Sequence, residues 1–562
     1  MNNSQNARSR NFIAQGSILA ITGILCRIIG MFYRIPLVEI IGTVGNGYYT
    51  SAYSIYNILL IISSYSLPVA ISKVVSTRLA RERYDDVRTA LRVAFVYATL
   101  IGALMCAVMY FGSDMIADAL EKPFCRYALR TLAPTIWIMA YLGILRGYFQ
   151  GSGNMVPTAV SQILEQVVNA VISILMAILL FNYGAKADLI YNETQYSYAY
   201  GAAGGTIGTG MGALVALLFF ILLFLFYGRM PAGNGVYESA GRSRRVRRKE
   251  SFLQLAGVLF ITLIPILLSS TIYNISTVLD DFIFSRRMAA FGMSASVVFL
   301  WGVFGEYRIL FNIPVAISNS LSSSVIPSLT NAVADRNKPV IASKIKISMQ
   351  FVMLVSIPAA AGLFALARPI CSLLFASEDN SLLVTVLRHG SLAIVLYSFS
   401  TITNGLLQGL GHLSEPLKNA VIALIVHVAA LFGILQLHPG INAVIYANTI
   451  FALTVCILNL RNLHRHVSFE INIGNTFVKP AIASVLMGGA AYGASVFLSA
   501  VLPDSFREGR SGLAVILFLS IGLALLVYAV LLVLLRSFTR EELLEMPMGG
   551  RILRFLNALG LM

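Results

Sequence analysis

Apolar segments of twenty or more residues recur from one end of this chain to the other, and they restrict its fold more than any other feature. Of its 562 residues, 57% are hydrophobic and only 12% are charged, with a mean hydropathy of +0.78. A water-soluble globular protein does not have this composition, because its surface would not be hydrated. Each segment is long enough to cross a hydrocarbon core about 30 Å thick. The sequence therefore predicts an all-α polytopic membrane protein.

The distribution of Lys and Arg residues between the two sides of the membrane tests the number of transmembrane helices. About 27 of the 41 Lys and Arg residues fall on one side of a fourteen-helix topology and about 8 fall on the other. This is the bias of the positive-inside rule, and an odd helix count would destroy it. We therefore expect both termini in the cytoplasm and fourteen transmembrane helices, over residues 12–41, 46–74, 87–112, 126–150, 155–182, 198–228, 252–284, 292–331, 340–367, 381–410, 414–437, 440–463, 474–501 and 511–537.

The net charge of +16 follows from this topology and from contact with anionic lipid headgroups. The basic run 242–249 contains no aromatic residues and lies between two predicted spans. It indicates an orientation signal and no nucleic-acid partner.

The five cysteines have no paired spacing, so we expect free thiols and no metal site or disulfide. The first apolar segment lacks a cleavage site of the A-x-A type, so it is predicted to be a retained helix.

One motif occurs twice. Gly147–Gly153 and Gly405–Gly411 share the pattern G-x-x-Q-G-x-G at an offset of 258, and each is followed by a proline, Pro157 or Pro416. A second pair, Leu67-Pro68 and Ile326-Pro327, has an offset of 259. Two matches at nearly one offset indicate an internal duplication of six helices. Because six is even, the repeats enter the membrane in the same sense, as two parallel lobes around a central cavity.

This duplication predicts the domain organisation. Helices thirteen and fourteen lie outside the repeats, and the last residues read as an amphipathic segment on the cytoplasmic face. The predicted parts are an N-lobe (1–228), a basic cytoplasmic linker (229–251), a C-lobe (252–466), two further helices (467–538) and a cytoplasmic tail (539–562).

Arginines inside the apolar segments are the leading candidates for substrate binding. Arg27 and Arg34 are seven residues apart, so their side chains leave the first helix on nearly one face. An arginine at mid-membrane costs at least about 2.5–3.5 kcal/mol, and such residues usually face a bundle interior or a wet cavity. Arg308 lies inside helix 292–331. We expect the three to converge and to bind a diphosphate through bidentate hydrogen bonds. The alternative is pairing with an internal carboxylate such as Glu39, or with backbone carbonyls.

Other embedded polar residues carry open alternatives. Glu306, Glu165 and Gln150 are secondary candidates for the cavity. Glu306 either bridges to a neighbouring helix or has a functional role, and for Glu165 a buried contact to Arg146 or a backbone group is favoured over a functional role. Asp280 and Asp281 either bind a coupling cation or, as we favour, pair with Arg286 and Arg287 near the outer surface. His427 is expected to be a packed, hydrogen-bonded histidine.

Catalytic motifs are missing from the sequence. It contains no P-loop, no H-E-x-x-H, no nucleophile elbow and no aspartate-rich loop for metal–nucleotide binding. The loops between helices reach about twenty residues, too few to fold a catalytic domain. We therefore expect a protein that is not an enzyme and needs no cofactor or metal. Coupling to the membrane potential or to a monovalent cation is compatible with it.

The stretch Leu145–Gln166 resembles the signature of the MurJ/SpoVB lipid II flippases of the MOP exporter superfamily. The segments Arg27–Gly30, Leu67–Lys73 and Glu306–Pro327 match as well, and the likeness covers nearly the whole chain. It implies a MATE-like arrangement of six, six and two helices, with functional arginines at Arg27, Arg34 and Arg308. Gram-negative members have a further basic residue where this chain has Ser63–Tyr65, and an acidic residue near Tyr48. Firmicute-type members look more like this sequence.

The resemblance implies that the chain flips lipid II, the undecaprenyl-diphosphate-linked peptidoglycan precursor, from the inner to the outer leaflet of a bacterial cytoplasmic membrane. We expect transport by alternating access between the two lobes, and a monomer is enough for this mechanism. A spore-cortex precursor or another lipid-linked oligosaccharide stays open as the cargo. The alternative function is a cation-coupled MATE-like multidrug exporter, but such proteins need acidic residues in the first lobe, and arginines repel cationic drugs. A membrane polymerase or ligase is disfavoured by the short outer loops.

Overall fold

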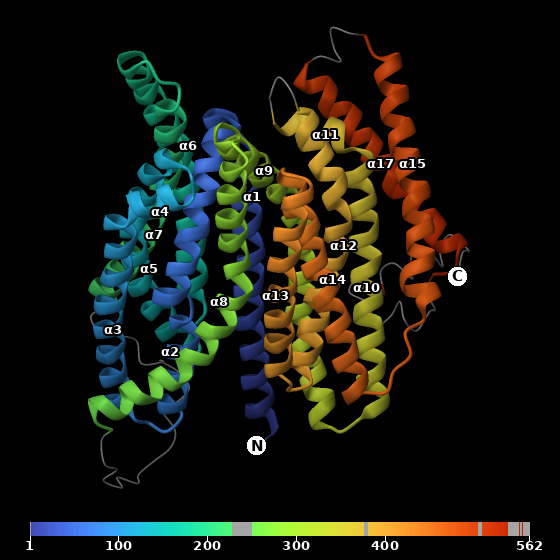
Figure 1. Cartoon of the computed structure of the whole chain (residues 1–562). Coiled ribbons are helices and arrows are strands. Elements are labelled where there is room, and N and C mark those ends of the chain that lie inside the picture. The colour runs from blue at the N-terminus through green and yellow to red at the C-terminus, as the bar shows by residue number, and fades with distance from the viewer. Residues whose placement is uncertain are drawn as a thin grey trace. The chain divides into compact units, whose positions relative to one another are not determined.

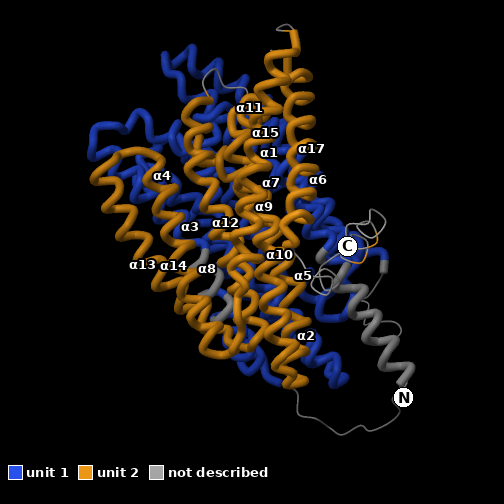
Figure 2. Tube along the Cα trace, turned by 90° about the vertical axis from the view of Figure 1, so that its right-hand side faces the viewer, with its two compact units in different colours: residues 1–302 blue, residues 303–562 orange. Residues whose placement is uncertain are grey.

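The computed structural model describes residues 2–227, 250–375, 380–503 and 509–537, together with residues 550 and 554, and the described chain is almost entirely helical (Figure 1). It divides into two compact units, residues 1–302 and residues 303–562 (Figure 2), and each is described by itself. Nearly all of the predicted linker 229–251 and nearly all of the predicted tail 539–562 lie outside the described residues.

Unit 1 is a helical bundle. Its tightest pair is α6 with α7, and α5 packs against α1, α2, α3 and α7. Its elements are α1 (Asn2–Leu60), the π-helix η1 (Ile61–Tyr65), α2 (Leu67–Leu79), α3 (Tyr84–Phe111), α4 (Ser113–Ala119), the 3-10 helix η2 (Pro123–Cys125), α5 (Arg126–Gly151), α6 (Val156–Tyr191), α7 (Tyr196–Tyr227), α8 (Phe252–Ala290) and the first turns of α9 (Ser294–Ala334).

Unit 2 begins inside α9 and is also a bundle. In it α12 packs between α10 and α14, and α15 pairs with α17. Its remaining elements are α10 (Lys338–Ala365), α11 (Ala367–Leu374), α12 (Ser381–Gly409), α13 (Ser414–Leu437), α14 (Ile441–His466), the π-helix η3 (Gly474–Val478), α15 (Lys479–Val501) and α17 (Arg510–Leu534).

The predicted all-helical membrane fold is confirmed, while the count of fourteen spans stays a prediction. Among the described residues, 12 helices are long and apolar enough to cross a membrane. That count takes Ile21–Leu79 as one span of 59 residues, and it leaves out α8. A single crossing needs only about 20 residues. The backbone does break within this stretch, because Gly42 has φ 67° and ψ 172°, next to the predicted end of the first helix at residue 41.

The repeated glycine motif has the same local structure at both positions. Gly153 (φ 82°) and Gly411 (φ 88°) follow α5 and α12 in the left-handed conformation that favours glycine. Gly147 lets α5 approach the backbone of α2 so closely that a Cβ atom would lie 2.9 Å from the carbonyl oxygen of Pro68. Gly405 has the same role between α12 and α9, where a Cβ atom would lie 2.0 Å from Oγ of Ser322.

The two compact units do not coincide with the predicted lobes. Helix α8 was expected to open the C-lobe at residue 252, but it packs on α1, α2 and α3, so the boundary of unit 1 falls at residue 302. The lobes were inferred from the repeat and not from packing, and they stay a prediction.

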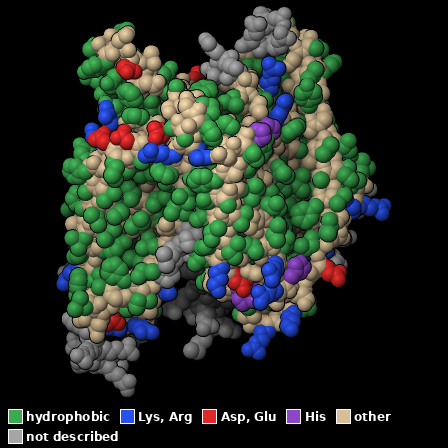
Figure 3. Space-filling model, in the orientation of Figure 1, with side chains coloured by type: hydrophobic (Ala, Val, Ile, Leu, Met, Phe, Trp, Pro, Cys, Tyr) green, Lys and Arg blue, Asp and Glu red, His purple; other side chains and the backbone are tan. Residues whose placement is uncertain are grey.

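Hydrophobic side chains cover much of the visible face (Figure 3). Large apolar residues of α6 and α15, such as Leu189 and Val485, are strongly exposed. Exposed apolar surface on this scale is expected where lipid tails replace water around a bundle.

Candidate functional site

Helix α1 carries both arginines of the predicted substrate site. Arg27 and Arg34 lie on one face of the helix, about 10 Å apart along its axis because each residue adds about 1.5 Å. Arg27 is exposed and Arg34 is half-buried. Tyr33, beside Arg34, is buried and faces the interior of unit 1.

Arg34 has no ionic partner in the described part of the chain. Its guanidinium carbon lies 4.4 Å from the ring centroid of Tyr49, a cation–π contact. The Nε atom of Arg34 is buried and makes no hydrogen bond to any described residue. Neither Arg27 nor Arg34 forms an ion pair within the described ranges, so the alternative of neutralisation by Glu39 finds no support there.

Next to Arg34 lies a group of hydroxyl and amide side chains that sequence reasoning missed, which we name the unit 1 polar cluster. Its members are Tyr33, Tyr49, Tyr53, Asn169, Ser173 and Thr209. The hydroxyls of Tyr33 and Tyr49 lie 3.3 Å apart, and Nδ2 of Asn169 donates to the Tyr33 hydroxyl at 3.3 Å. The Thr209 hydroxyl donates to Oδ1 of Asn169 at 3.3 Å and contacts that of Tyr53. The cluster therefore reaches Arg34 through Tyr49, and its members are neutral hydroxyl and amide groups.

Arg146 contrasts with Arg34. Its Nη2 atom donates to Oε2 of Glu165 at 2.7 Å, and its Nε atom donates to Oγ of Ser161 at 3.0 Å. Glu165 therefore has a structural partner, and the favoured prediction of a buried contact between α5 and α6 is confirmed. Gln150, the third secondary candidate, is half-buried near the end of α5.

Unit 2 holds the remaining candidates. Arg308 is half-buried in α9, with its guanidinium carbon 5.9 Å from the ring centroid of Phe304. Glu306 is buried and lies near Cys371 of α11. Burial raises the pKa of the Cys371 thiol, and the charge of Glu306 raises this pKa further. Because Arg308 and Arg34 belong to different units, the predicted convergence of the three arginines stays a prediction.

A cavity of about 430 Å³ opens on unit 2, and no motif in the sequence indicated it. It lies between α9, α10 and α12 and is lined by Leu321, Ser324, Val325, Ser328, Val340, Ser343, Lys344, Ile347, Ser348, Phe351 and Ile402. Four serines and one lysine make part of this wall polar. The serines come from helices that otherwise read as continuous apolar segments.

The favoured partners of the two aspartates in α8 were partly wrong. Asp281 accepts a hydrogen bond from Nζ of Lys122 at 2.5 Å, and Arg286 pairs instead with Glu121 at 3.1 Å. Lys122 is fully buried, donates to Oγ of Ser51 at 2.8 Å and lies 4.7 Å from the ring centroid of Trp301. Burial lowers the pKa of Lys122, and the negative charge of Asp281 opposes that shift. Their position near the outer surface had suggested pairing with the nearby arginines, but the fold supplies Asp281 with a partner 159 positions away.

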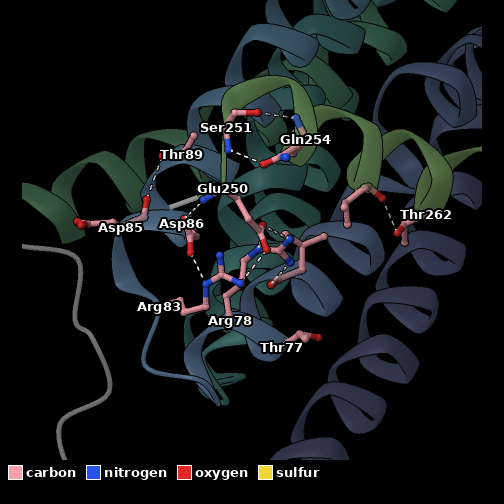
Figure 4. A network of polar contacts seen from close by, with 12 residues as sticks. Thr77, Arg78, Arg83, Asp85, Asp86, Thr89, Glu250, Ser251, Gln254 and Thr262 are labelled. Carbon is pink, nitrogen blue, oxygen red and sulfur yellow. Dashed lines mark hydrogen bonds and ion pairs between the residues drawn. The ribbon is translucent and has the colours of Figure 1, made fainter. Parts of the chain in front are cut away.

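The other end of α8 is held by a charge network (Figure 4). Oε2 of Glu250 accepts from Nη2 of Arg78 at 2.7 Å, and Oε1 accepts from Nη1 of Arg83 at 2.8 Å. Arg83 also donates to Asp86 at 2.5 Å, and Asp86 accepts the backbone N–H of Glu250 at 3.0 Å. A capping box of Ser251 and Gln254 then begins the helix. Of the other three charged residues, Arg78 lies in the last turn of α2, Arg83 in the turn that follows, and Asp86 in the first turn of α3.

His427 of α13 is buried, and its ring lies edge-on to that of Phe451 with the centroids 5.8 Å apart, so its predicted packing is confirmed. Its predicted hydrogen bond stays a prediction. The five cysteines are free thiols, also as predicted.

Comparison with known sequences gives a consistent set of relatives. A family model described as polysaccharide biosynthesis protein matches residues 12–329. Stage V sporulation protein B of Bacillus subtilis is 24% identical over 549 residues, which covers 97% of this chain and 99% of that protein. Lipid II flippase MurJ of the same organism is 23% identical over 534 residues, with 91% and 93% of the two chains covered.

Solved structures share the fold. A structure of lipid II flippase MurJ in an inward closed conformation is similar with a TM-score of 0.64 at 15% identity, over 91% of this chain and 97% of that chain. An inward-facing multidrug resistance transporter of the MATE family in the MOP superfamily gives a TM-score of 0.59 at 15% identity, over 78% and 98% of the two chains. The likeness extends over most of this chain.

Proposed function

Because the chain belongs to the polysaccharide biosynthesis protein family, we propose that it moves lipid II, or a related lipid-linked oligosaccharide diphosphate, from the inner to the outer leaflet of a bacterial cytoplasmic membrane. Two relatives covered over most of their length support this proposal, and one of them is named a lipid II flippase. Both termini are proposed to face the cytoplasm, in line with the segregation of Lys and Arg. A monomer is sufficient for the mechanism.

The observation that carries the proposal is the buried Nε atom of Arg34, which has no acceptor in the described part of the chain. A buried polar group without a partner is costly, and a charged one is more so. A diphosphate supplies several anionic acceptors, and guanidinium binds phosphate oxygens through charge-assisted bonds. The unit 1 polar cluster adds neutral hydroxyls beside Arg34 for the oxygens that the guanidinium does not reach.

The proposed transport cycle is alternating access. Arg27, Arg34 and Arg308 bind the diphosphate while the cavity faces inward, and the isoprenoid tail stays in lipid. Closing the inner gate then opens the outer side. The membrane potential assists, because moving about two negative charges outward at 100 mV releases roughly 4–5 kcal/mol at about 2.3 kcal/mol per charge. Coupling to a monovalent cation is a second possible source of energy.

The cargo is tested by complementation. Expression in a strain depleted of its own lipid II flippase is expected to restore growth, and Arg27→Ala and Arg308→Ala are expected to abolish rescue while the protein is still inserted at the normal level. Arg130→Ala is the control, because Arg130 is half-buried and already pairs with Asp114 at 2.6 Å.

The multidrug exporter is the alternative that this experiment separates. The shared fold with a MATE transporter fits either function, but the interior of unit 1 presents Arg34, which repels cationic drugs. Drug resistance on expression, together with failure to rescue the depleted strain, would overturn the flippase proposal.

A further inference from the structure

Three side chains that are distant in sequence meet at one end of α13 and α14. His412 lies in the turn between α12 and α13, Glu415 lies in the first turn of α13, and His466 is the last residue of α14. One ligand atom from each lies within 4.8 Å of the others, in the only such group found among the described residues. Histidine and charged side chains gather on the visible face at this end of the two helices (Figure 3).

The contacts within this group are direct. Nε2 of His466 lies 2.7 Å from Oε1 of Glu415, although the two residues are 51 positions apart. The rings of His412 and His466 stack with their centroids 3.6 Å apart and an angle of 16° between their planes. Oε2 of Glu415 is buried and has no hydrogen-bond partner among the described residues. The fold thus leaves one carboxylate oxygen unsatisfied beside two imidazole rings.

A glycine turn and a buried hydrogen bond between side chains hold these three residues in place. Gly411 has φ 88°, which turns the chain so that His412 follows α12 and precedes α13. One turn further along α13, Nδ2 of Asn419 donates to Oδ1 of Asn459 of α14 at 2.8 Å, and both amides are buried. This bond fixes the spacing of α13 and α14 next to the group. Glu415 and His466 therefore lie on packed helices, and His412 lies in a short turn between two of them.

Two imidazoles and a carboxylate are the donors that Zn²⁺ and neighbouring transition ions prefer, whereas Mg²⁺ and Ca²⁺ prefer oxygen alone. Zinc binds nitrogen and oxygen ligands at about 2.0–2.2 Å, so tetrahedral ligand atoms lie about 3.3 Å from one another. Rotations of the side chains bring atoms within 4.8 Å to that spacing. A bound cation would also satisfy Oε2 of Glu415.

We propose that His412, Glu415 and His466 bind a divalent transition-metal ion of the Zn²⁺ class, with water at the fourth position. The ion links the turn before α13 to the end of α14, on the side of the membrane predicted to be cytoplasmic. The site is separate from the arginines assigned to the substrate, and it stands whether or not the chain flips lipid II.

The test uses the full-length protein in detergent, purified through a tag without histidines and stripped of metal with a chelator. Titration with ZnCl₂ is followed by calorimetry, and titration with CoCl₂ is followed by the visible absorption of tetrahedral Co²⁺. The wild type is expected to bind one ion. His412→Ala, Glu415→Gln and His466→Ala are each expected to weaken binding by at least about tenfold, because even changes to outer-shell partners cost 10–100-fold.

The matched control is His464→Ala. His464 lies two residues before His466 on the same helix end, and its ring stacks on Phe469 at 4.4 Å, outside the group. It is expected to bind Zn²⁺ as the wild type does. Thermal unfolding without metal confirms that each variant is folded, and added Zn²⁺ should raise the unfolding temperature of the wild type and of His464→Ala only. Wild-type protein that binds no ion, or ligand variants that bind as tightly as the control, would overturn the proposal.

Discussion

Arg34 and Arg146 both lie inside apolar helices of unit 1, but their surroundings differ. Arg146 donates to Glu165 and to Ser161, so its charge is matched within the chain. Arg34 stacks on Tyr49, and its buried Nε atom has no acceptor among the described residues. The charge of Arg146 has a structural role, because its contacts hold α5 against α6. An unpaired charge in a membrane protein points to a ligand from outside the chain.

Two further charged groups extend this comparison. Lys122 and Asp281 form the most buried pair of unit 1, with exposed side-chain fractions of 0% and 1%. The network of Glu250 with Arg78 and Arg83 is partly exposed, since Glu250 keeps 26% of its side-chain surface. These four sites therefore form a series. It runs from the buried ion pair of Lys122, through the pair of Arg146 and the partly exposed network of Glu250, to Arg34 without an ionic partner among the described residues. Variants at these sites should lose stability in that order.

Lys122→Met should have the largest effect on stability. It leaves the carboxylate of Asp281 buried without its cation, and breaking a buried pair in this way costs about 3–5 kcal/mol. Denaturant or thermal unfolding in detergent measures the loss. The double variant Lys122→Met with Asp281→Leu removes both charges and should recover much of it. A single variant as stable as the wild type would show that the pair does not hold α8.

Glu165→Gln should come second. It removes the charge opposite Arg146 but keeps a hydrogen-bond acceptor, so we expect a loss of about 2 kcal/mol, in the range for hydrogen bonds to charged groups. Glu193→Gln, in an exposed turn, is the control and should leave the unfolding curve unchanged. Unchanged stability together with lost transport would instead make Glu165 a residue of the substrate cavity.

Glu250→Gln should have a smaller effect, about 1 kcal/mol or less, because partly exposed ion pairs are weak. Salt screens such pairs, so the difference from wild type should shrink between low and high ionic strength. Glu470→Gln, another exposed carboxylate, tests for a general effect of removing charge. A loss of Glu250→Gln stability that does not change with salt would mean that the network behaves as a buried one.

Arg34→Ala should have the smallest effect on stability. The lost stacking on Tyr49 costs about 0.5–1 kcal/mol, and removing an unsatisfied buried donor offsets it. We expect an unfolding temperature close to that of the wild type in the absence of substrate. Strong destabilisation would mean that Arg34 supports the fold, and the contrast with Arg146 would disappear.

Much of the helical layout could be predicted from the sequence, because long apolar segments and glycine or proline breaks are local signals. Helix α13 runs from Ser414 to Leu437 as expected, and the break at Gly42 falls where the first helix was predicted to end. The contact between Arg146 and Glu165 could also be predicted, because the two residues are only 19 positions apart, on consecutive helices.

Contacts between segments that are distant in the chain could not be predicted from the sequence. Lys122 and Asp281 are 159 positions apart, and a local arginine beside Asp281 was the natural but wrong choice. The unit 1 polar cluster joins α1, α6 and α7 through residues that are each unremarkable in an apolar helix. His412 and His466 have no recognisable metal-ligand spacing, because the turn between helices and the pairing of α13 with α14 bring them together.

Reconstituted flipping of lipid II by Arg34→Ala tests whether Arg34 binds the substrate. Purified wild type, Arg34→Ala and the control Arg130→Ala are placed in vesicles with labelled lipid II, and the fraction that crosses between leaflets is followed over time. We expect normal flipping by the wild type and by Arg130→Ala, and loss of flipping by Arg34→Ala in a folded protein. Flipping by Arg34→Ala at the wild-type rate would contradict this assignment.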